Sequence, residues 1–290
     1  MFKGSIVALV TPFKDGKVDE EVYRELIELQ IQGGTSAISP CGTTGESATL
    51  DMEEHTRVID MAIEAVNKRV PVIAGTGGNS TSEAIELTKH AKEAGADATL
   101  QVTPYYNKPT QEGLYQHYKA IAKAVPLPQV LYNVPGRTSI NLLPETVARL
   151  AELPEVVAVK EASGNLEQMA EIVQLAGDKI TLLSGDDNVT LPVLAIGGKG
   201  VVSVVANIVP KDTADMVKAW EEGNVERARE LFLRLLPLCK AMFYETNPIP
   251  VKTSLALMGK IKEELRLPLV PISPANRERL KKALQNYGLI

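Results

Sequence analysis

Lys160 is the residue of this 290-residue chain whose position most strongly suggests chemistry, because it ends an apolar run at residues 156–159. If that run is a strand buried on both faces, an ammonium group at its end is unfavourable unless it is paired or neutral. A neutral amine in such a place can attack a carbonyl substrate and form an imine. A salt bridge to Glu161 or to another carboxylate would instead make Lys160 purely structural, and its position alone leaves both interpretations open.

Hydroxyl and guanidinium side chains follow other apolar runs at comparable points. Tyr106 and Tyr132 lie at or near the ends of two such runs, and a phenol can relay protons when a hydroxyl such as that of Thr44 holds it. Strand-end tyrosines are also common packing residues with a hydrated tip, which is the competing interpretation. Arg137 follows a Pro-Gly turn and suits recognition of a carboxylate, although a single loop arginine is more often a solvated surface charge.

Eight short apolar runs must position these side chains. They are rich in β-branched residues, bounded by Gly, Pro or Asp, and apolar without strict alternation, which is typical of parallel strands buried on both faces. Amphipathic stretches with helical spacing separate them; one begins after the capping residues 80–82 and ends before Gly95. The runs lie at residues 5–10, 36–40, 70–75, 98–102, 128–133, 156–160, 180–185 and 200–205.

The repeated order of strand and helix predicts an α/β protein, specifically a (β/α)8 TIM barrel over residues 1–222. A doubly wound sheet shares this order, but the expected glycine-rich turn after the first strand is replaced here by TPFKDGK. Residues 223–290 predict three further helices, and no low-complexity linker precedes them. We therefore expect a C-terminal helical extension that packs with the barrel as one unit.

Composition excludes several other classes of function. The 31 Lys and Arg against 36 Asp and Glu give a net charge of −5, which argues against nonspecific nucleic-acid binding. No apolar stretch is long enough to span a membrane, and Cys41 and Cys239 cannot form a disulfide framework, so a reducing cytoplasm is expected. His55, His90 and His117 lack metal-ligand spacing, and we expect no metal site.

Two loops bear on whether the substrate carries a phosphate group. The sequence GTGGNS at 75–80 opens a helix and could hold an anion on backbone N–H groups. The usual phosphate site of a barrel follows strands seven and eight. The first of those loops is SGDDN, which places Asp186 and Asp187 there and disfavours a phosphorylated substrate.

Six motifs in order resemble the dihydrodipicolinate synthase family, part of the pyruvate-dependent class I aldolase superfamily that includes N-acetylneuraminate lyase. The similarity extends from residue 4 to the C-terminus. The motifs are GTTGES (42–47), TPYYNKPTQEGLYQHY (103–118), YNVPGRT (132–138), VKEASGN (159–165), LLSGDD (182–187) and ETNPIPVK (245–252).

The resemblance implies an activity as well as a fold. Family members condense pyruvate with L-aspartate 4-semialdehyde, the committed step toward diaminopimelate and lysine, without a cofactor. Lys160 matches the Schiff-base lysine of the family, and Tyr132 matches a proton-shuttling tyrosine that is hydrogen-bonded to Thr44 and to Tyr106 of a neighbouring subunit. Arg137 matches the residue that holds the carboxylate of the semialdehyde. Family members are typically homotetramers, built as dimers of tight dimers.

The remaining site residues follow from the same resemblance. Thr43 and Thr44 match the site for the carboxylate of pyruvate, and Gly185 and Val202 match main-chain or packing positions near the lysine. Val202 is commonly Ile in the family, a mild change. Many family members are inhibited by L-lysine at the dimer interface, and the matching positions here are Ser47, Ala48, Asn79, Glu83 and Tyr105. Met52 departs from the lysine-sensitive pattern, which often has His there.

Three alternatives are weighed against this function. A sister aldolase acting on a sugar acid would use the same Lys160, but Thr43, Thr44 and Arg137 together favour the synthase. A catalytically idle metabolite sensor predicts the loss of Lys160 or Tyr132, and both are present. A phosphate-binding isomerase barrel is disfavoured by the SGDDN loop.

Overall fold

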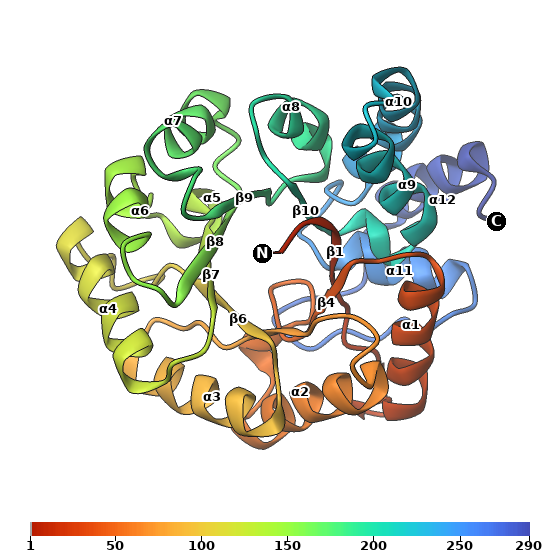
Figure 1. The fold of residues 1–290 in the computed structure, drawn as a ribbon. Coiled ribbons are helices and arrows are strands. Elements are labelled where there is room, and N and C mark those ends of the chain that lie inside the picture. The colour runs from red at the N-terminus through yellow and green to blue at the C-terminus, as the bar shows by residue number, and fades with distance from the viewer. Residues whose placement is uncertain (1) are drawn as a thin grey trace.

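The computed structural model describes residues 2–290 and shows eight parallel strands that close into a barrel inside a ring of helices (Figure 1). The strands are β1 (Gly4–Ala8), β4 (Ala37–Ser39), β5 (Ile73–Gly75), β6 (Ala98–Val102), β7 (Gln129–Asn133), β8 (Val156–Glu161), β9 (Thr181–Ser184) and β10 (Gly200–Ser203). Their order around the sheet is β4-β1-β10-β9-β8-β7-β6-β5, and a parallel bridge between Ile38 and Val72 closes it. The expected (β/α)8 barrel is confirmed.

Each apolar run of the sequence overlaps one of these strands, and β1 and β8 extend one residue beyond their runs. The residues of β1, β4, β5, β7, β9 and β10 are all buried, because the barrel interior covers one face and the helices cover the other. This double burial explains the absence of alternation in the sequence. The run at 70–75 forms a continuous strand only from Ile73, because Pro71 has no N–H and the N–H of Val72 donates to the Asp97 carboxylate.

Helices cover the outside of the barrel (Figure 1). The expected capping signals are confirmed in the helix Thr81–Ala94. The Ser80 hydroxyl accepts a hydrogen bond from the Glu83 N–H, and Gly95 ends the helix with φ +99°. The helices are α1 (Glu20–Gln32), α2 (Met52–Val66), α3 (Thr81–Ala94), α4 (Gln111–Ala124), α6 (Pro144–Leu150), α7 (Leu166–Ala176), α8 (Thr190–Ala195) and α9 (Pro210–Glu221). Shorter turns are η1 (Ser47–Thr49), α5 (Pro135–Thr138), η2 (Asp187–Val189) and η3 (Val205–Asn207). No helix among residues 2–290 combines the length and apolar character needed to cross a bilayer.

A two-stranded hairpin after β1 was not expected from the sequence. Strands β2 (Phe13–Lys14) and β3 (Lys17–Val18) pair antiparallel across Asp15 and Gly16, whose φ angles are +55° and +79°. An Asp-Gly pair with positive φ is a strong hairpin signal, so the KDGK segment could have revealed it. The carboxylate of Glu264 accepts hydrogen bonds from both turn N–H groups, at 2.9 and 2.6 Å, and docks the hairpin on the C-terminal region.

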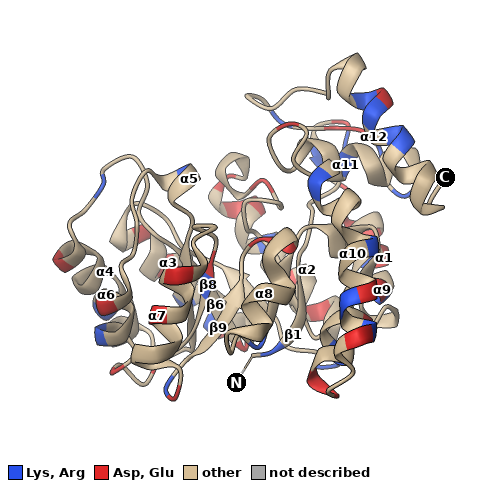
Figure 2. Ribbon diagram, turned by 90° about the horizontal axis from the view of Figure 1, so that it is seen from above, with Lys and Arg blue, Asp and Glu red and all other residues tan. Residues whose placement is uncertain are grey.

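The expected C-terminal helices are α10 (Val225–Ala241), α11 (Ile249–Leu257) and α12 (Pro274–Tyr287). Figure 2 shows α11 and α12 at the same end of the barrel as α5, opposite the N-terminus. A single apolar cluster includes Val7 of the barrel together with Leu231, Val251 and Leu280 of the extension. From this shared core we propose that residues 1–222 and 223–290 fold as one unit.

A buried ion pair also joins the two parts. The Nζ of Lys252 in α11 lies 2.5 Å from Oε1 of Glu46, which follows β4, and each side chain is only 1% exposed. Glu46 Oε2 accepts a hydrogen bond from the backbone N–H of Arg266 at 3.1 Å, and the Lys252 ammonium lies 4.2 Å from the ring centroid of Phe13. Burial lowers the pKa of Lys252, and the negative charge of Glu46 opposes that shift.

Replacing Glu46 with Gln is expected to lower the free energy of unfolding by about 3–5 kcal/mol, because the Lys252 ammonium would stay buried without its counter-ion. The double variant Glu46→Gln/Lys252→Met removes both charges and should recover most of that loss. Urea denaturation followed by far-UV circular dichroism and by the fluorescence of Trp220, the single tryptophan, measures both effects. One folding unit requires the two probes to report the same transition, and separate transitions would contradict it.

Candidate active site

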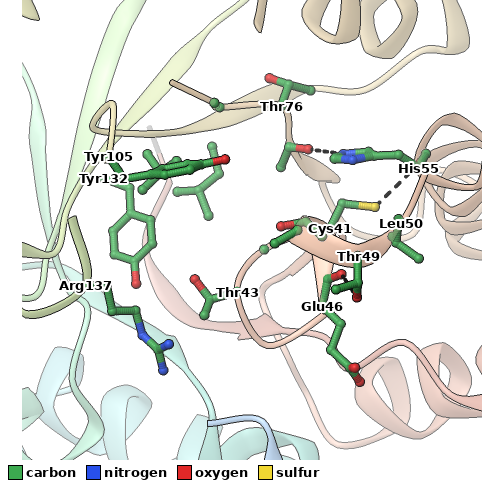
Figure 3. Close-up of a pocket in the computed structure, with 18 of the residues that line it drawn as sticks. Cys41, Thr43, Glu46, Thr49, Leu50, His55, Thr76, Tyr105, Tyr132 and Arg137 are labelled. Carbon is green, nitrogen blue, oxygen red and sulfur yellow. Dashed lines mark hydrogen bonds between the residues drawn. The ribbon is translucent and has the colours of Figure 1, made fainter. Parts of the chain in front are cut away.

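A cavity of about 430 Å³ opens where the strands end at their carboxyl termini. Its walls come from the segments that follow β4, β5, β6 and β7 and from two segments of the C-terminal extension. Figure 3 shows Tyr132 and Arg137 on one side of this cavity, Cys41, Leu50 and His55 on the other, and Thr43 between them. The lining residues include Thr43, Gly77, Tyr105, Tyr132, Arg137, Asn247 and Leu269.

Lys160 and Tyr132 are direct neighbours on β8 and β7. The two residues are register partners, and Lys160 Nζ lies 4.0 Å from the centroid of the Tyr132 ring. Each residue is 6% exposed. Among residues 2–290, no carboxylate oxygen lies within 4.0 Å of the Lys160 amine. The salt bridge that would have made Lys160 purely structural is therefore not formed.

Glu161 has other partners, because successive residues of a strand point to opposite faces. Its carboxylate accepts hydrogen bonds from Asn133 Nδ2 at 2.9 and 3.1 Å, from the Ser163 N–H at 2.7 Å and from Gln168 Nε2 at 3.2 Å. Burial raises the pKa of Glu161, and these donors oppose the shift. The network fixes the end of β8 and leaves the amine of Lys160 unpaired on the other face.

The loop after β4 presents Thr43 and Thr44. Within the loop, the N–H of Gly45 donates to the Gly42 carbonyl and the N–H of Glu46 donates to the Thr43 carbonyl, both at 3.1 Å. These bonds form a tight turn with the two threonines in its centre. Thr43 lines the cavity, whereas Thr44 is 2% exposed and lies deeper.

Asn247 joins two of the expected site residues and was not singled out from the sequence. Its Nδ2 donates to Thr44 Oγ1 at 3.0 Å, and its main-chain carbonyl accepts from Arg137 Nη2 at 3.1 Å. The direct hydrogen bond expected between Tyr132 and Thr44 is not formed within the described chain. The ETNPIPVK motif was the signal available for Asn247, but nothing in its spacing indicates which residue reaches the site.

The structure does not bring Tyr106 to Tyr132 within one chain. Tyr106 has φ +72° and is 91% exposed. Gly185 follows β9, the strand that pairs with β8, whereas Val202 lies in β10, one strand further around the barrel. Gly185 donates its N–H to the Glu161 carbonyl at 2.7 Å, and a Cβ at this position would lie 2.6 Å from the Ala162 Cβ. The glycine thus lets the end of β9 approach the end of β8.

The glycine-rich loop at 75–80 and the SGDDN loop both have structural explanations. A Cβ on Gly75 would lie 2.1 Å from the Cys41 carbonyl oxygen, and one on Gly77 would lie 2.3 Å from the Val102 nitrogen. These glycines therefore permit close packing between strand ends. In the SGDDN loop, Asp187 Oδ2 accepts hydrogen bonds from the N–H groups of Val204 and Val205 at 2.9 and 3.0 Å. Burial raises the pKa of Asp186, an effect that the charge of Lys160 opposes.

Most of the expected effector residues line the same cavity. Ser47, Ala48, Glu83 and Tyr105 belong to its walls, together with Met52 and His55. Asn79 is not among the lining residues, and its carbonyl accepts a hydrogen bond from Asn107 Nδ2 at 2.8 Å. His55 Nε2 lies 2.7 Å from the Gly75 carbonyl oxygen, and burial lowers the pKa of this histidine.

In (β/α)8 barrel enzymes the active site lies at the carboxyl ends of the strands. The amine, phenol and guanidinium found there in this chain are therefore typical of an enzyme of this class. The model of the Dihydrodipicolinate synthetase family matches residues 1–287. A relative from Geotalea uraniireducens strain Rf4, named 4-hydroxy-tetrahydrodipicolinate synthase, is 64% identical over the full length of both chains. The chain belongs to the dihydrodipicolinate synthetase family, and it is a lyase of the aldolase type.

Solved structures give the same result. The chloride-inhibited dihydrodipicolinate synthase from Acinetobacter baumannii, complexed with pyruvate, has a TM-score of 0.98 and 50% identity, with 100% of each chain covered. The enzyme from Cyanidioschyzon merolae with lysine bound has a TM-score of 0.97 and 45% identity, with 100% of this chain and 99% of that chain covered.

Proposed function

We propose that the protein is a 4-hydroxy-tetrahydrodipicolinate synthase, which condenses pyruvate with L-aspartate 4-semialdehyde in the first committed step of diaminopimelate and lysine biosynthesis. The observation that carries this proposal is the unpaired amine of Lys160 against the ring of Tyr132 at the barrel mouth. The names of the relatives support it, as does the pyruvate complex of the Acinetobacter baumannii enzyme.

The proposed reaction begins at the amine of Lys160. The deprotonated amine attacks the keto carbon of pyruvate, and the carbonyl oxygen takes one proton from the amine and one from the proton relay. This oxygen leaves as water, and a protonated imine forms. The imine draws electrons from the neighbouring methyl group, which loses a proton to give an enamine. The enamine carbon bonds to the aldehyde carbon of the semialdehyde, and the aldehyde oxygen takes up a proton. The amine of the semialdehyde then attacks the imine carbon, closes the ring and releases Lys160.

The neighbouring residues have roles in this scheme. Tyr132, Thr44 and Tyr106 move protons between the substrates and solvent. Thr43 and Thr44 hold the carboxylate of pyruvate, and Arg137 holds that of the semialdehyde through a charge-assisted hydrogen bond. Because the protonated imine is itself the electron sink, the scheme requires no metal ion or organic cofactor. Gly185 and Val202 shape the space around Lys160.

Lys160→Ala is expected to lower kcat by at least about 10³-fold, because no other described amine stands in this position. Borohydride reduction of the wild-type protein in the presence of pyruvate should leave a pyruvate-sized adduct on Lys160, detected by intact mass and peptide mapping. The double variant Glu46→Gln/Lys252→Met is the control for a second buried lysine, because it removes Lys252 without leaving Glu46 unpaired, and it should retain labelling at Lys160. A folded wild-type protein without the adduct would refute the mechanism, and turnover of a sugar acid instead of the semialdehyde would indicate a sister aldolase.

We further propose a homotetramer built from tight dimers, in which Tyr106 of one subunit enters the proton relay of another. The exposure of Tyr106 and its left-handed backbone support this assignment, because a bulky side chain rarely adopts such a conformation without a partner. Two free buried cysteines are consistent with a reducing cytoplasm as the site of action. Cell fractionation tests that location.

Tyr106→Phe is expected to lower kcat about 10- to 100-fold while borohydride labelling of Lys160 by pyruvate is retained. Tyr115→Phe, in α4, is the control and should keep the wild-type rate. Co-expression of Tyr106→Phe and Lys160→Ala subunits should restore activity, because mixed dimers then contain one site with both wild-type residues. Sedimentation analysis gives the oligomeric state. An inactive mixed dimer would place Tyr106 outside the partner's site.

L-Lysine is the proposed effector of the site formed by Ser47, Ala48, Asn79, Glu83 and Tyr105. The lysine-bound Cyanidioschyzon merolae enzyme supports this proposal. In a turnover assay, Glu83→Gln should raise the half-inhibitory lysine concentration at least about tenfold, because the carboxylate pairs with the ammonium of the effector. Glu86→Gln, one turn further along α3, should leave inhibition unchanged. A wild-type enzyme that is insensitive to millimolar lysine would contradict the proposal.

A further inference from the structure

Asn247 holds two parts of the site through two different groups. It lies between α10 and α11, outside the barrel, and is 4% exposed. Its side-chain amide donates to the hydroxyl of Thr44, whereas its main-chain carbonyl accepts from the guanidinium of Arg137. One residue of the C-terminal extension therefore contacts both a proposed proton carrier and a proposed carboxylate anchor.

The hydrogen bond from Asn247 constrains the direction in which Thr44 can donate. A hydroxyl has one proton to donate and two lone pairs with which to accept. Because Thr44 Oγ1 accepts from Nδ2 of Asn247, its own proton is free for another acceptor, and the incoming bond polarises the hydroxyl toward that donation. Asn247 Oδ1 is buried and has no partner among the described residues, so Thr44 does not donate back to it.

The backbone on either side of Asn247 is held firmly. Lys252 is fixed five residues further on by its buried ion pair with Glu46. Two residues earlier, the carboxylate of Glu245 accepts hydrogen bonds from the Ser273 N–H at 3.0 Å and from Asn276 Nδ2 at 2.9 Å. Asn247 therefore lies in a segment that is held on both sides, and this fixes the position of its amide donor relative to Thr44.

We propose that Asn247 is a positioning residue that orients the Thr44 hydroxyl for proton transfer through its side chain and holds Arg137 through its main chain. This inference rests on the proposed function, since it concerns the proton relay of that reaction. If the segment only became looser, the contacts with Thr44 and Arg137 would both weaken, whereas the proposed role predicts that a side-chain substitution affects Thr44 alone. Loss of the side chain removes the bond to Thr44, but the carbonyl that holds Arg137 is kept.

Asn247→Ala is expected to lower kcat about 5- to 20-fold, the effect of one hydrogen bond that acts in the transition state. KM for the semialdehyde should stay within about twofold of the wild-type value, because Arg137 retains its partner. Asn276→Ala is the matched control, since it removes a side-chain amide that holds the same segment at Glu245. It should leave kcat within about twofold. Parallel falls in kcat for both variants would reduce Asn247 to a structural role.

A double-mutant cycle with Thr44→Val tests whether Asn247 acts through the hydroxyl. If it does, adding Asn247→Ala to Thr44→Val should lower kcat by less than about twofold further. Independent effects, in which the double variant loses the product of the two single factors, would overturn the proposal.

Asn247→Asp provides a second variant of nearly the same shape. An ionised carboxylate only accepts hydrogen bonds, so it would draw the Thr44 proton away from the substrates. We expect kcat at pH 8 to fall at least as far as in Asn247→Ala, and the ratio to wild type to rise as the pH is lowered and the carboxyl gains a proton to donate. A ratio that does not change with pH would count against the proposal.

Borohydride labelling separates this inference from the proposed function. In Asn247→Ala, pyruvate should still label Lys160, because the amine, Thr43 and the Thr44 hydroxyl are all retained and reduction traps even a slowly formed imine. If the wild-type protein and Asn247→Ala are both labelled and kcat is the same in the two, the role of Asn247 is overturned but the proposed function stands. Failure to label the wild-type protein overturns the proposed function itself.

Discussion

The pairing of β7 with β8 is the constraint on which the site depends. In this register Tyr132 lies opposite Lys160 and Asn133 lies opposite Glu161, after an irregularity between Gln129 and Val130. A shift of one residue would reverse the faces of a strand. Such a shift in β8 would turn the Glu161 carboxylate toward Tyr132 and Lys160 toward the helices. The three polar donors around Glu161 and the closed ring of strands both oppose that arrangement.

The barrel alone does not complete the cavity. Strand ends supply the amine and the phenol, but the threonine loop and Arg137 are both held by residues of the C-terminal extension. This division follows from the geometry of parallel barrels, in which strands fix side chains rigidly and the following loops are exposed. A loop that must present a hydroxyl in one orientation needs support from a second layer. Here a buried ion pair and a buried amide provide it.

The sequence was sufficient for the architecture because burial on both faces leaves a strong apolar signal in every barrel strand. Lys160 was conspicuous for the same reason, since it interrupts that signal. The hairpin formed by Phe13–Lys14 and Lys17–Val18 was missed because two-residue strands carry no periodicity, although Asp15-Gly16 marked its turn. Asn247 was missed because its role arises from contacts across 203 positions, which no local pattern encodes. The direct bond between Tyr132 and Thr44 came from resemblance alone, and the structure gives Thr44 a different partner.

The separation in sequence between Glu46 and Lys252 has a consequence for protein synthesis. The carboxylate leaves the ribosome 206 residues before the cation that neutralises it. Until that point every strand of the barrel can emerge, yet Glu46 has no buried counter-ion and Thr44 lacks its amide donor. A truncated chain that stops before α11 would therefore carry Lys160 and Tyr132 without the wall that the extension adds to the cavity. The site is therefore completed only after α11 has been made, when the extension packs on loops that were made much earlier.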